Sequence, residues 1–380
     1  MNPTTIESST DRNYWCDCIR GYAILIVCFA HLFYVEPCAA RFGFLTHYFK
    51  GDTGVFMFYV LSGFLVTGIL AREVANQTGG RPRLRAVGHF FARRIFRLQP
   101  SNLVFLGCYA LLPAQENALA WWMVLLPFSN WFGGPYITWH LKTLHVEETY
   151  YAFMGVVTCI FGNRLKALLW VMLIVSPLGR AGLFILIKQG NESAGWLLDR
   201  YLPVEAFAVG GLLTLYLSQI KAGRWGQIIA RRPTLSFSVA MIALLLAGAL
   251  RPVKPFSYFL LFTWPMFFSI CSLVMILSGL EKERFVFSAR WLHSLGLMSY
   301  TVYLFQQFVL GPWSDTYGVN YSWKLWGLLV AALCVAIPLW YRYVEKPLTG
   351  LGSRMFPRIK SVVPVSIYNN MPELMVKPRD

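Results

Sequence analysis

The chain has 380 residues, of which 56% are hydrophobic and 14% are charged, and its mean hydropathy is +0.50. Soluble globular proteins carry about 25% charged residues, so this composition excludes an ordinary soluble enzyme and indicates an all-α, polytopic protein of the lipid bilayer. The formal net charge of +16 does not indicate a nucleic-acid partner, because lysines and arginines in cytoplasmic loops of a membrane protein account for it.

Apolar runs separated by breaker residues predict about ten membrane spans. They lie near residues 19–36, 54–71, 98–113, 143–161, 167–187, 199–218, 234–250, 256–280, 295–312 and 323–341. No small-residue cleavage site follows the first run, so we expect a retained span and not a signal peptide. The eight cysteines show no disulfide framework.

Basic residues set the expected orientation. The segment 72–97 carries seven arginines and one glutamate, and further basic clusters follow the sixth, eighth and tenth runs. With an even span count these loops share one side, which the positive-inside rule identifies as the cytoplasm. We therefore predict a cytoplasmic N-terminal segment (1–18), a transmembrane domain (19–347) and a cytoplasmic tail (348–380), in the inner (plasma) membrane.

From Ile19 to Tyr34 the first span is almost entirely apolar, and Arg20 and His31 are the exceptions. Eleven residues separate them, which is close to three helical turns and places both on one face, about 16 Å apart. An ionisable side chain inside a membrane span is expensive and marks a functional site, which makes His31 a candidate. The alternative is a histidine that is satisfied by a neighbouring carbonyl group.

Three arginines lie before the third apolar run. Arg93, Arg94 and Arg97 would form one cationic cluster on a helix, and arginine suits forked contacts with phosphate oxygens. The alternative is that they serve topology alone, since any cytoplasmic loop of a membrane protein collects arginine.

Two adjacent acids, Glu147 and Glu148, open the fourth run. Neighbouring helix positions point in different directions, so we expect one of them to face a given cavity, where a carboxylate could orient a histidine or share its proton transfer. Interfacial acids that face water are the alternative.

Two outer stretches could contact a second substrate. Arg200, at the outer end of the sixth run, could hold an acidic group or snorkel to the interface. Trp139 belongs to an aromatic-rich stretch, 114–140, whose rings suit either the membrane interface or a sugar acceptor.

Six motifs in order resemble the acyltransferase-3 family of integral-membrane O-acyltransferases, which modify bacterial surface polysaccharides, lipopolysaccharide O-antigens and secreted oligosaccharides. They are Arg20-x10-His31, the run from Gly54 to Leu65 that contains Leu-Ser-Gly-Phe-Leu, Arg93-Arg-x-x-Arg-x-x-Pro100, Val146-Glu-Glu-Thr-Tyr-Tyr151, Ser299-Tyr-Thr-Val-Tyr-Leu304 and Val344-Glu-Lys-Pro347. The resemblance covers residues 20 to about 347, nearly the whole chain.

The resemblance implies a membrane-bound enzyme that transfers an acyl group from acyl-coenzyme A, usually acetyl-coenzyme A, to a hydroxyl of a carbohydrate or glycolipid. It implies essential roles for Arg20 and His31 and importance for Arg93, Arg94 and Arg97. Cytoplasmic arginines would hold the donor's phosphates, and His31 would act as a base or carry the acyl group. No metal is expected.

The chain departs from the family pattern at two places. Phe56 stands where many relatives have an acid, and Phe305 and Gln306 stand where many have a histidine. A different class, a transporter or flippase that uses His31 and the glutamates as a proton relay, also fits an ionisable group at the midplane. Transporters commonly show paired halves, and this sequence shows no internal repeat.

Overall fold

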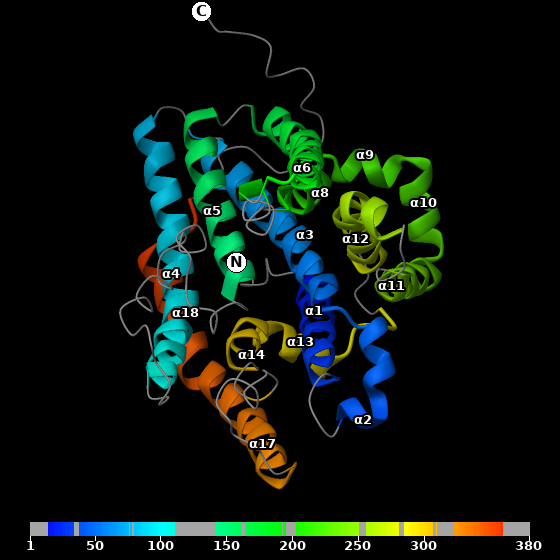
Figure 1. The fold of residues 1–380 in the computed structure, drawn as a ribbon. Coiled ribbons are helices and arrows are strands. Elements are labelled where there is room, and N and C mark those ends of the chain that lie inside the picture. The colour runs from blue at the N-terminus through cyan, green and yellow to red at the C-terminus, as the bar shows by residue number, and fades with distance from the viewer. Residues whose placement is uncertain are drawn as a thin grey trace, which may run out of the picture.

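The structure, a computed structural model, is helical and confirms the all-α prediction for the residues that it describes. These are residues 14–33, 38–75, 77, 80–110, 141–161, 164–191, 193–194, 203–250, 256–280, 285–306, 309 and 323–359. Figure 1 shows α1 and α3 at the centre of the bundle, with α4 and α5 on one side and α11 and α12 on the other.

The helices follow the apolar runs closely in most places. Their bounds are α1 Tyr14–Leu32, α2 Cys38–Phe42, α3 Gly51–Leu70, α4 Gly80–Ala110, α5 Lys142–Phe161, α6 Leu165–Lys188, α8 Val204–Leu215, α9 Leu217–Ala222, α10 Arg224–Arg231, α11 Pro233–Leu250, α12 Phe256–Gly279, α13 Arg290–Leu297, α14 Ser299–Phe305, α17 Trp323–Trp340 and α18 Lys346–Met355. Short 3₁₀ or π segments occupy Gly43–His47, Ala71–Ala75 and Tyr341–Glu345.

Five helical segments in the described part of the chain are long and apolar enough to cross a membrane. They are Tyr14–Leu32, Gly51–Val74, Leu165–Lys188, Pro233–Leu250 and Gly327–Met355, and two shorter apolar helices cover Val204–Leu215 and Thr263–Gly279. The chain is therefore a multi-pass membrane protein, while the count of ten spans and the cytoplasmic termini remain predictions.

The third predicted span is part of a much longer helix. α4 begins at Gly80, not near residue 98, and includes the arginine-rich segment that the sequence suggested as a loop. Leucine, alanine, phenylalanine and arginine fill most of this segment, and these residues favour a helix. Pro82 stands in the first turn, where a backbone N–H would have no partner within the helix, and the helix continues through Gly88 and Pro100. The arginines are thus fixed to a rigid element.

The ninth predicted span is divided in two. α13 ends at Leu297 and α14 begins at Ser299, with Met298 as the junction. Three residues on α14 line the pocket described below: Ser299, Tyr300 and Tyr303. The break therefore lies where the chain turns its polar side chains toward the site.

Small residues bring α3 and α8 into direct backbone contact in the core. A β-carbon added at Gly63 would overlap the carbonyl oxygen of Phe207, and one at Gly210 would overlap that of Val60. Such close approach of helices, which small side chains permit, supplies the packing that apolar lipid cannot drive. This contact fixes α3, which carries Ser62 and Tyr59 into the site.

We expect Gly210→Ala to destabilise the protein by about 1–3 kcal/mol, because the added methyl group overpacks the α3–α8 contact. Gly182→Ala in α6 is the matched control, since no described atom lies within 4 Å of its added β-carbon. Thermal unfolding of the detergent-solubilised protein measures both. A midpoint for Gly210→Ala equal to that of the control would show that the two helices separate without cost.

Candidate active site

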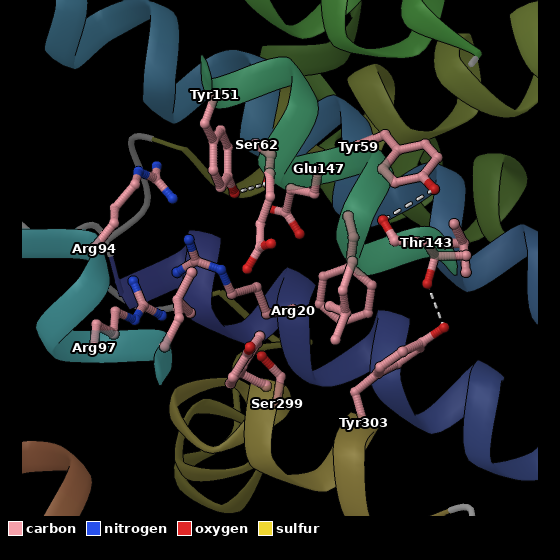
Figure 2. Close-up of a pocket in the computed structure, with 16 residues that line it drawn as sticks. Arg20, Tyr59, Ser62, Arg94, Arg97, Thr143, Glu147, Tyr151, Ser299 and Tyr303 are labelled. Atoms are coloured by element: carbon pink, nitrogen blue, oxygen red, sulfur yellow. Dashed lines mark hydrogen bonds between the residues drawn. The ribbon is translucent and has the colours of Figure 1, made fainter. Parts of the chain in front are cut away.

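One pocket gathers most of the polar residues that the sequence singles out (Figure 2). Its polar lining comes from α1, α3, α4, α5 and α14, and comprises Arg20, Tyr59, Ser62, Arg94, Arg97, Thr143, Glu147, Glu148, Tyr151, Ser299, Tyr300 and Tyr303. Figure 2 shows the side chains of Arg20, Arg94 and Arg97 on one side of the pocket, with Glu147 and Ser62 across from them and Tyr151 beside Arg94.

The pocket arginines present N–H donors to the space between them. Arg94 and Arg97 lie three residues apart on α4 and so share a face. The guanidinium carbon of Arg94 lies 3.6 Å from the ring centroid of Tyr151 and 4.8 Å from that of Phe90. The described residues supply no hydrogen-bond acceptor to Arg94, although a guanidinium carries five donors. This arrangement favours an anionic ligand.

Arg20 reaches the pocket from α1. Its Nη1 donates to Asp17 Oδ1 at 2.7 Å, and its side chain is 16% exposed. Among the described residues Asp17 is its hydrogen-bond partner, so the remaining N–H groups of Arg20 are also available to a ligand. Arg20 and His31 lie on the same helix, α1, about three turns apart.

Arg93 lies elsewhere, although it stands next to Arg94 in the sequence. Its Nη2 contacts Glu73 Oε2 at 2.5 Å and its Nη1 donates to the carbonyl oxygen of Phe356 at 3.0 Å. Consecutive helix positions differ by about 100° in direction, so one neighbour faces the pocket and the other faces the segment after α18. The structure therefore does not bring Arg93 together with Arg20, Arg94 and Arg97.

Both adjacent acids line the pocket. Thr143, Leu144, Glu147, Glu148 and Tyr151 all contribute, so the pocket wraps around a stripe of α5 wide enough to include neighbouring positions. We expected one acid of the pair to face the cavity, and the structure instead places both Glu147 and Glu148 in its lining.

The two acids nevertheless differ in their partners. Ser62 Oγ donates a hydrogen bond to Glu147 Oε1, and the same hydroxyl lies 3.2 Å from the Tyr151 hydroxyl. Within the described chain no residue donates a hydrogen bond to Glu148. Serines in helix interiors often bond the carbonyl four residues back, as Ser269 and Ser272 do here, whereas Ser62 is directed at Glu147. Glu147 is thus held in one position from α3.

The motifs Ser299–Leu304 and Val344–Pro347 contact each other on the side of α14 that faces away from the pocket. Thr301 Oγ1 donates to Glu345 Oε2 at 2.8 Å, and Ser101 bridges Thr301 and the Trp340 indole at 3.3 and 2.9 Å. Tyr300 donates to Asn102 Oδ1 at 2.6 Å. These bonds join α14 to α4 and to the end of α17, so the motifs Ser299–Leu304 and Val344–Pro347 contact each other, although the second does not line the pocket.

His31 does not line this pocket. It lies half-buried in the last turn of α1, and an apolar cluster of Ile24, Val27 and Tyr303 occupies the stretch between it and Arg20. The first turn of α3 lies beside it, since an added β-carbon at Gly51 would be 4.0 Å from the Ala30 β-carbon. His31 therefore sits beyond the pocket, at the other end of the same helix.

Three residues near the site escaped the sequence reasoning. Ser62 stands among small residues, which indicate helix packing and gave no sign of its bond to Glu147. Asp17 stands three residues before Arg20, and this helical spacing could have predicted their contact. Asp52 stands one turn before Phe56, in the first turn of α3, which lies beside the last turn of α1 that carries His31. An acid at the start of an apolar run was the available signal.

Two predicted acceptor contacts, Arg200 and Trp139, lie outside the described residues, as does the aromatic-rich stretch 114–140. Within the described ranges no group of three or more histidine, cysteine, aspartate or glutamate side chains is arranged to hold a metal ion.

Comparisons with known proteins concern the chain as a whole. Residues 13–341 match the family model described as "Acyltransferase domain". A curated Bacillus subtilis (strain 168) protein named "Putative peptidoglycan O-acetyltransferase YrhL" is 24% identical over 374 residues, which cover 90% of this chain and 56% of that protein. The chain thus spans about half the length of this relative. No solved structure matches the chain significantly.

Proposed function

Because the chain belongs to the acyltransferase-3 family, whose model spans residues 13–341, we propose that it transfers an acetyl group from acetyl-coenzyme A to a hydroxyl of a carbohydrate or glycolipid acceptor. The observation that carries the proposal is the pocket in which Arg20, Arg94 and Arg97 converge. The relative named for peptidoglycan O-acetylation supports an acetyl donor and a surface glycan as the acceptor.

The donor's phosphate groups are the natural ligand of this pocket. Arginine forms short, forked, charge-assisted hydrogen bonds with phosphate oxygens, and two of the three pocket arginines keep N–H groups without an acceptor in the described chain. Basic residues on and around α4 favour a cytoplasmic position for this end, where coenzyme A is found. We assign donor contact to Arg20, Arg94 and Arg97.

In the proposed reaction the donor binds at this pocket, and the chemical step takes place at His31, at the other end of α1. An extended pantetheine arm that leaves the arginines would carry the thioester along α1 toward His31 once the apolar side chains of Ile24, Val27 and Tyr303, which fill this stretch, move aside. There His31 takes the proton of the acceptor hydroxyl, the hydroxyl oxygen attacks the thioester carbon, and coenzyme A leaves as its thiol. Arg200 and Trp139 would contact the acceptor from the outer side.

Arg94→Ala should raise the apparent KM for acetyl-coenzyme A at least about tenfold, because a charge-assisted hydrogen bond contributes about 1.5–3 kcal/mol. Arg93→Ala is the matched control: it removes the same charge one position away, from a side chain that pairs with Glu73 and does not line the pocket. Arg94→Lys should restore binding in part, since a point charge lacks the fork.

The assay uses the full chain in sealed proteoliposomes that are loaded with radiolabelled acetyl-coenzyme A and supplied externally with glycan fragments. Transfer of label to the glycan, with KM raised by Arg94→Ala and unchanged by Arg93→Ala, supports the function. Equal effects of the two variants would favour a role of these arginines in topology alone. Proton-driven movement of glycan without acyl transfer would favour the transporter alternative.

A further inference from the structure

Asp17 bonds Arg20, one of the pocket arginines, from a position outside the pocket lining. Its carboxylate is fully buried, and its Oδ1 accepts a hydrogen bond from Arg20 Nη1 at 2.7 Å. Because this bond engages one of the five N–H groups, it restrains the guanidinium and leaves the other N–H groups at the pocket. Neither the family match nor the named relative assigns a role to this aspartate.

The packing of α1 against α13 keeps Asp17 in this place. A β-carbon added at Gly296 would overlap the backbone carbonyl of Asp17, and one added at Gly21 would overlap that of Leu292. The two helices therefore touch through their backbones around Asp17 and Arg20. His293 of α13 brings Nε2 within 3.7 Å of Asp17 Oδ2, and its ring stacks on Tyr14 with centroids 4.2 Å apart.

Asp17 differs from the two glutamates that share the pocket with the arginines. Glu147 and Glu148 line the same space as Arg20, Arg94 and Arg97, whereas Asp17 does not line it. A buried carboxylate that is bonded to Arg20 therefore holds this side chain without entering the space that a ligand would fill. A long arginine side chain would otherwise lose rotamer entropy when a ligand binds, and a preorganised one loses less.

We propose that Asp17 is a positioning residue that presents the Arg20 guanidinium to the donor's phosphate groups. Asp17 acts through Arg20 and touches no reacting atom, so its removal weakens donor binding and leaves the chemical step unchanged. This inference rests on the proposed function, because it takes acetyl-coenzyme A as the ligand of the pocket.

The test compares Asp17→Asn with Glu73→Gln in the same proteoliposomes. Each variant neutralises the carboxylate of an arginine pair, but Arg20 lines the pocket and Arg93 does not. We expect Asp17→Asn to raise the KM for acetyl-coenzyme A about tenfold with kcat within twofold of wild type, and Glu73→Gln to leave both constants unchanged. A KM for Asp17→Asn within twofold of wild type overturns the proposal.

A double-mutant cycle separates positioning from a purely structural role. If Asp17 acts through Arg20, then Asp17→Asn combined with Arg20→Ala binds donor no more weakly than Arg20→Ala alone. Multiplicative losses in the double variant, or a fall in kcat with unchanged KM, overturn the proposal. Should Asp17→Asn not accumulate in the membrane, Asp17→Glu gives the same test, since it keeps the charge but displaces the carboxylate by one methylene group.

Failure of the proposed function would look different. In that case wild-type protein would neither turn over nor bind acetyl-coenzyme A, whereas failure of the positioning role alone leaves wild-type turnover intact and the Asp17→Asn constants unchanged.

Discussion

His31→Ala is expected to abolish acyl transfer while the protein remains folded in the membrane. Imidazole is the side chain whose unperturbed proton affinity suits a base near pH 7, and positioned bases contribute about 10²–10⁴-fold to rate. His31 lies in the last turn of α1, half-buried and beside the first turn of α3, so its replacement leaves the arginine pocket intact. Acetyl-coenzyme A binding should therefore survive while turnover disappears.

His31→Gln and His47→Ala complete this experiment. Glutamine keeps a hydrogen-bonding group without proton transfer, so it should be as inactive as alanine if the imidazole moves a proton. His47, at the end of the 3₁₀ segment Gly43–His47, is an exposed histidine outside the pocket lining, and its loss should leave transfer unchanged. Wild-type rates for His31→Ala at normal membrane abundance would remove His31 from the mechanism.

The second large effect is expected at Glu147. Glu147→Gln should lower kcat on the order of 10²-fold, the scale of a misplaced reactant, because this carboxylate is fixed by the Ser62 hydroxyl, faces the arginines across the pocket and so positions the bound donor. Glu148→Gln should have a smaller effect, since no described residue donates a hydrogen bond to Glu148 and its carboxyl is less well positioned. Steady-state kinetics with saturating acetyl-coenzyme A measure both variants.

Ser62→Ala tests whether Glu147 depends on its hydrogen bond. Without the hydroxyl the carboxylate loses its fixed position, so kcat should fall in the direction of Glu147→Gln. The chain offers a matched control in Ser176, a buried serine of α6 that also donates to a glutamate, Glu205, but outside the pocket lining. Ser176→Ala should reduce stability and leave kcat unchanged. A larger loss for Glu148→Gln than for Glu147→Gln would reverse the assignment of the two acids.

Local sequence features were enough to predict several parts of this protein. The all-α class and the multi-pass character follow from long apolar runs, because a bilayer admits only segments that satisfy their own backbone hydrogen bonds. The motif order predicted the acyltransferase family that the match over residues 13–341 shows. The helical spacing of Arg94 and Arg97 predicted their shared face, on which both reach the pocket.

Other features depend on packing between helices, which no local pattern contains. Arg93 and Arg94 are adjacent and identical in type, and the sequence gives no reason to separate them. In the structure Arg93 forms an ion pair with Glu73, whereas Arg94 lies over the ring of Tyr151. The paired acids both reach the pocket because α5 presents a broad stripe to α3 and α4. These outcomes depend on which helix lies alongside, and that is decided by long-range contacts.

The sequence by itself determined that this is a helical membrane protein with an Arg-x10-His first span, an arginine cluster and an acidic pair, because composition, run length and spacing are properties of single segments. Only the tertiary structure decided that Arg20, Arg94, Arg97 and the glutamates share one pocket, that Arg93 stands apart and that His31 lies beyond an apolar layer. The physical reason is that a side chain's direction is set by its own helix, while its partner is set by the packing of five helices that meet from distant parts of the chain.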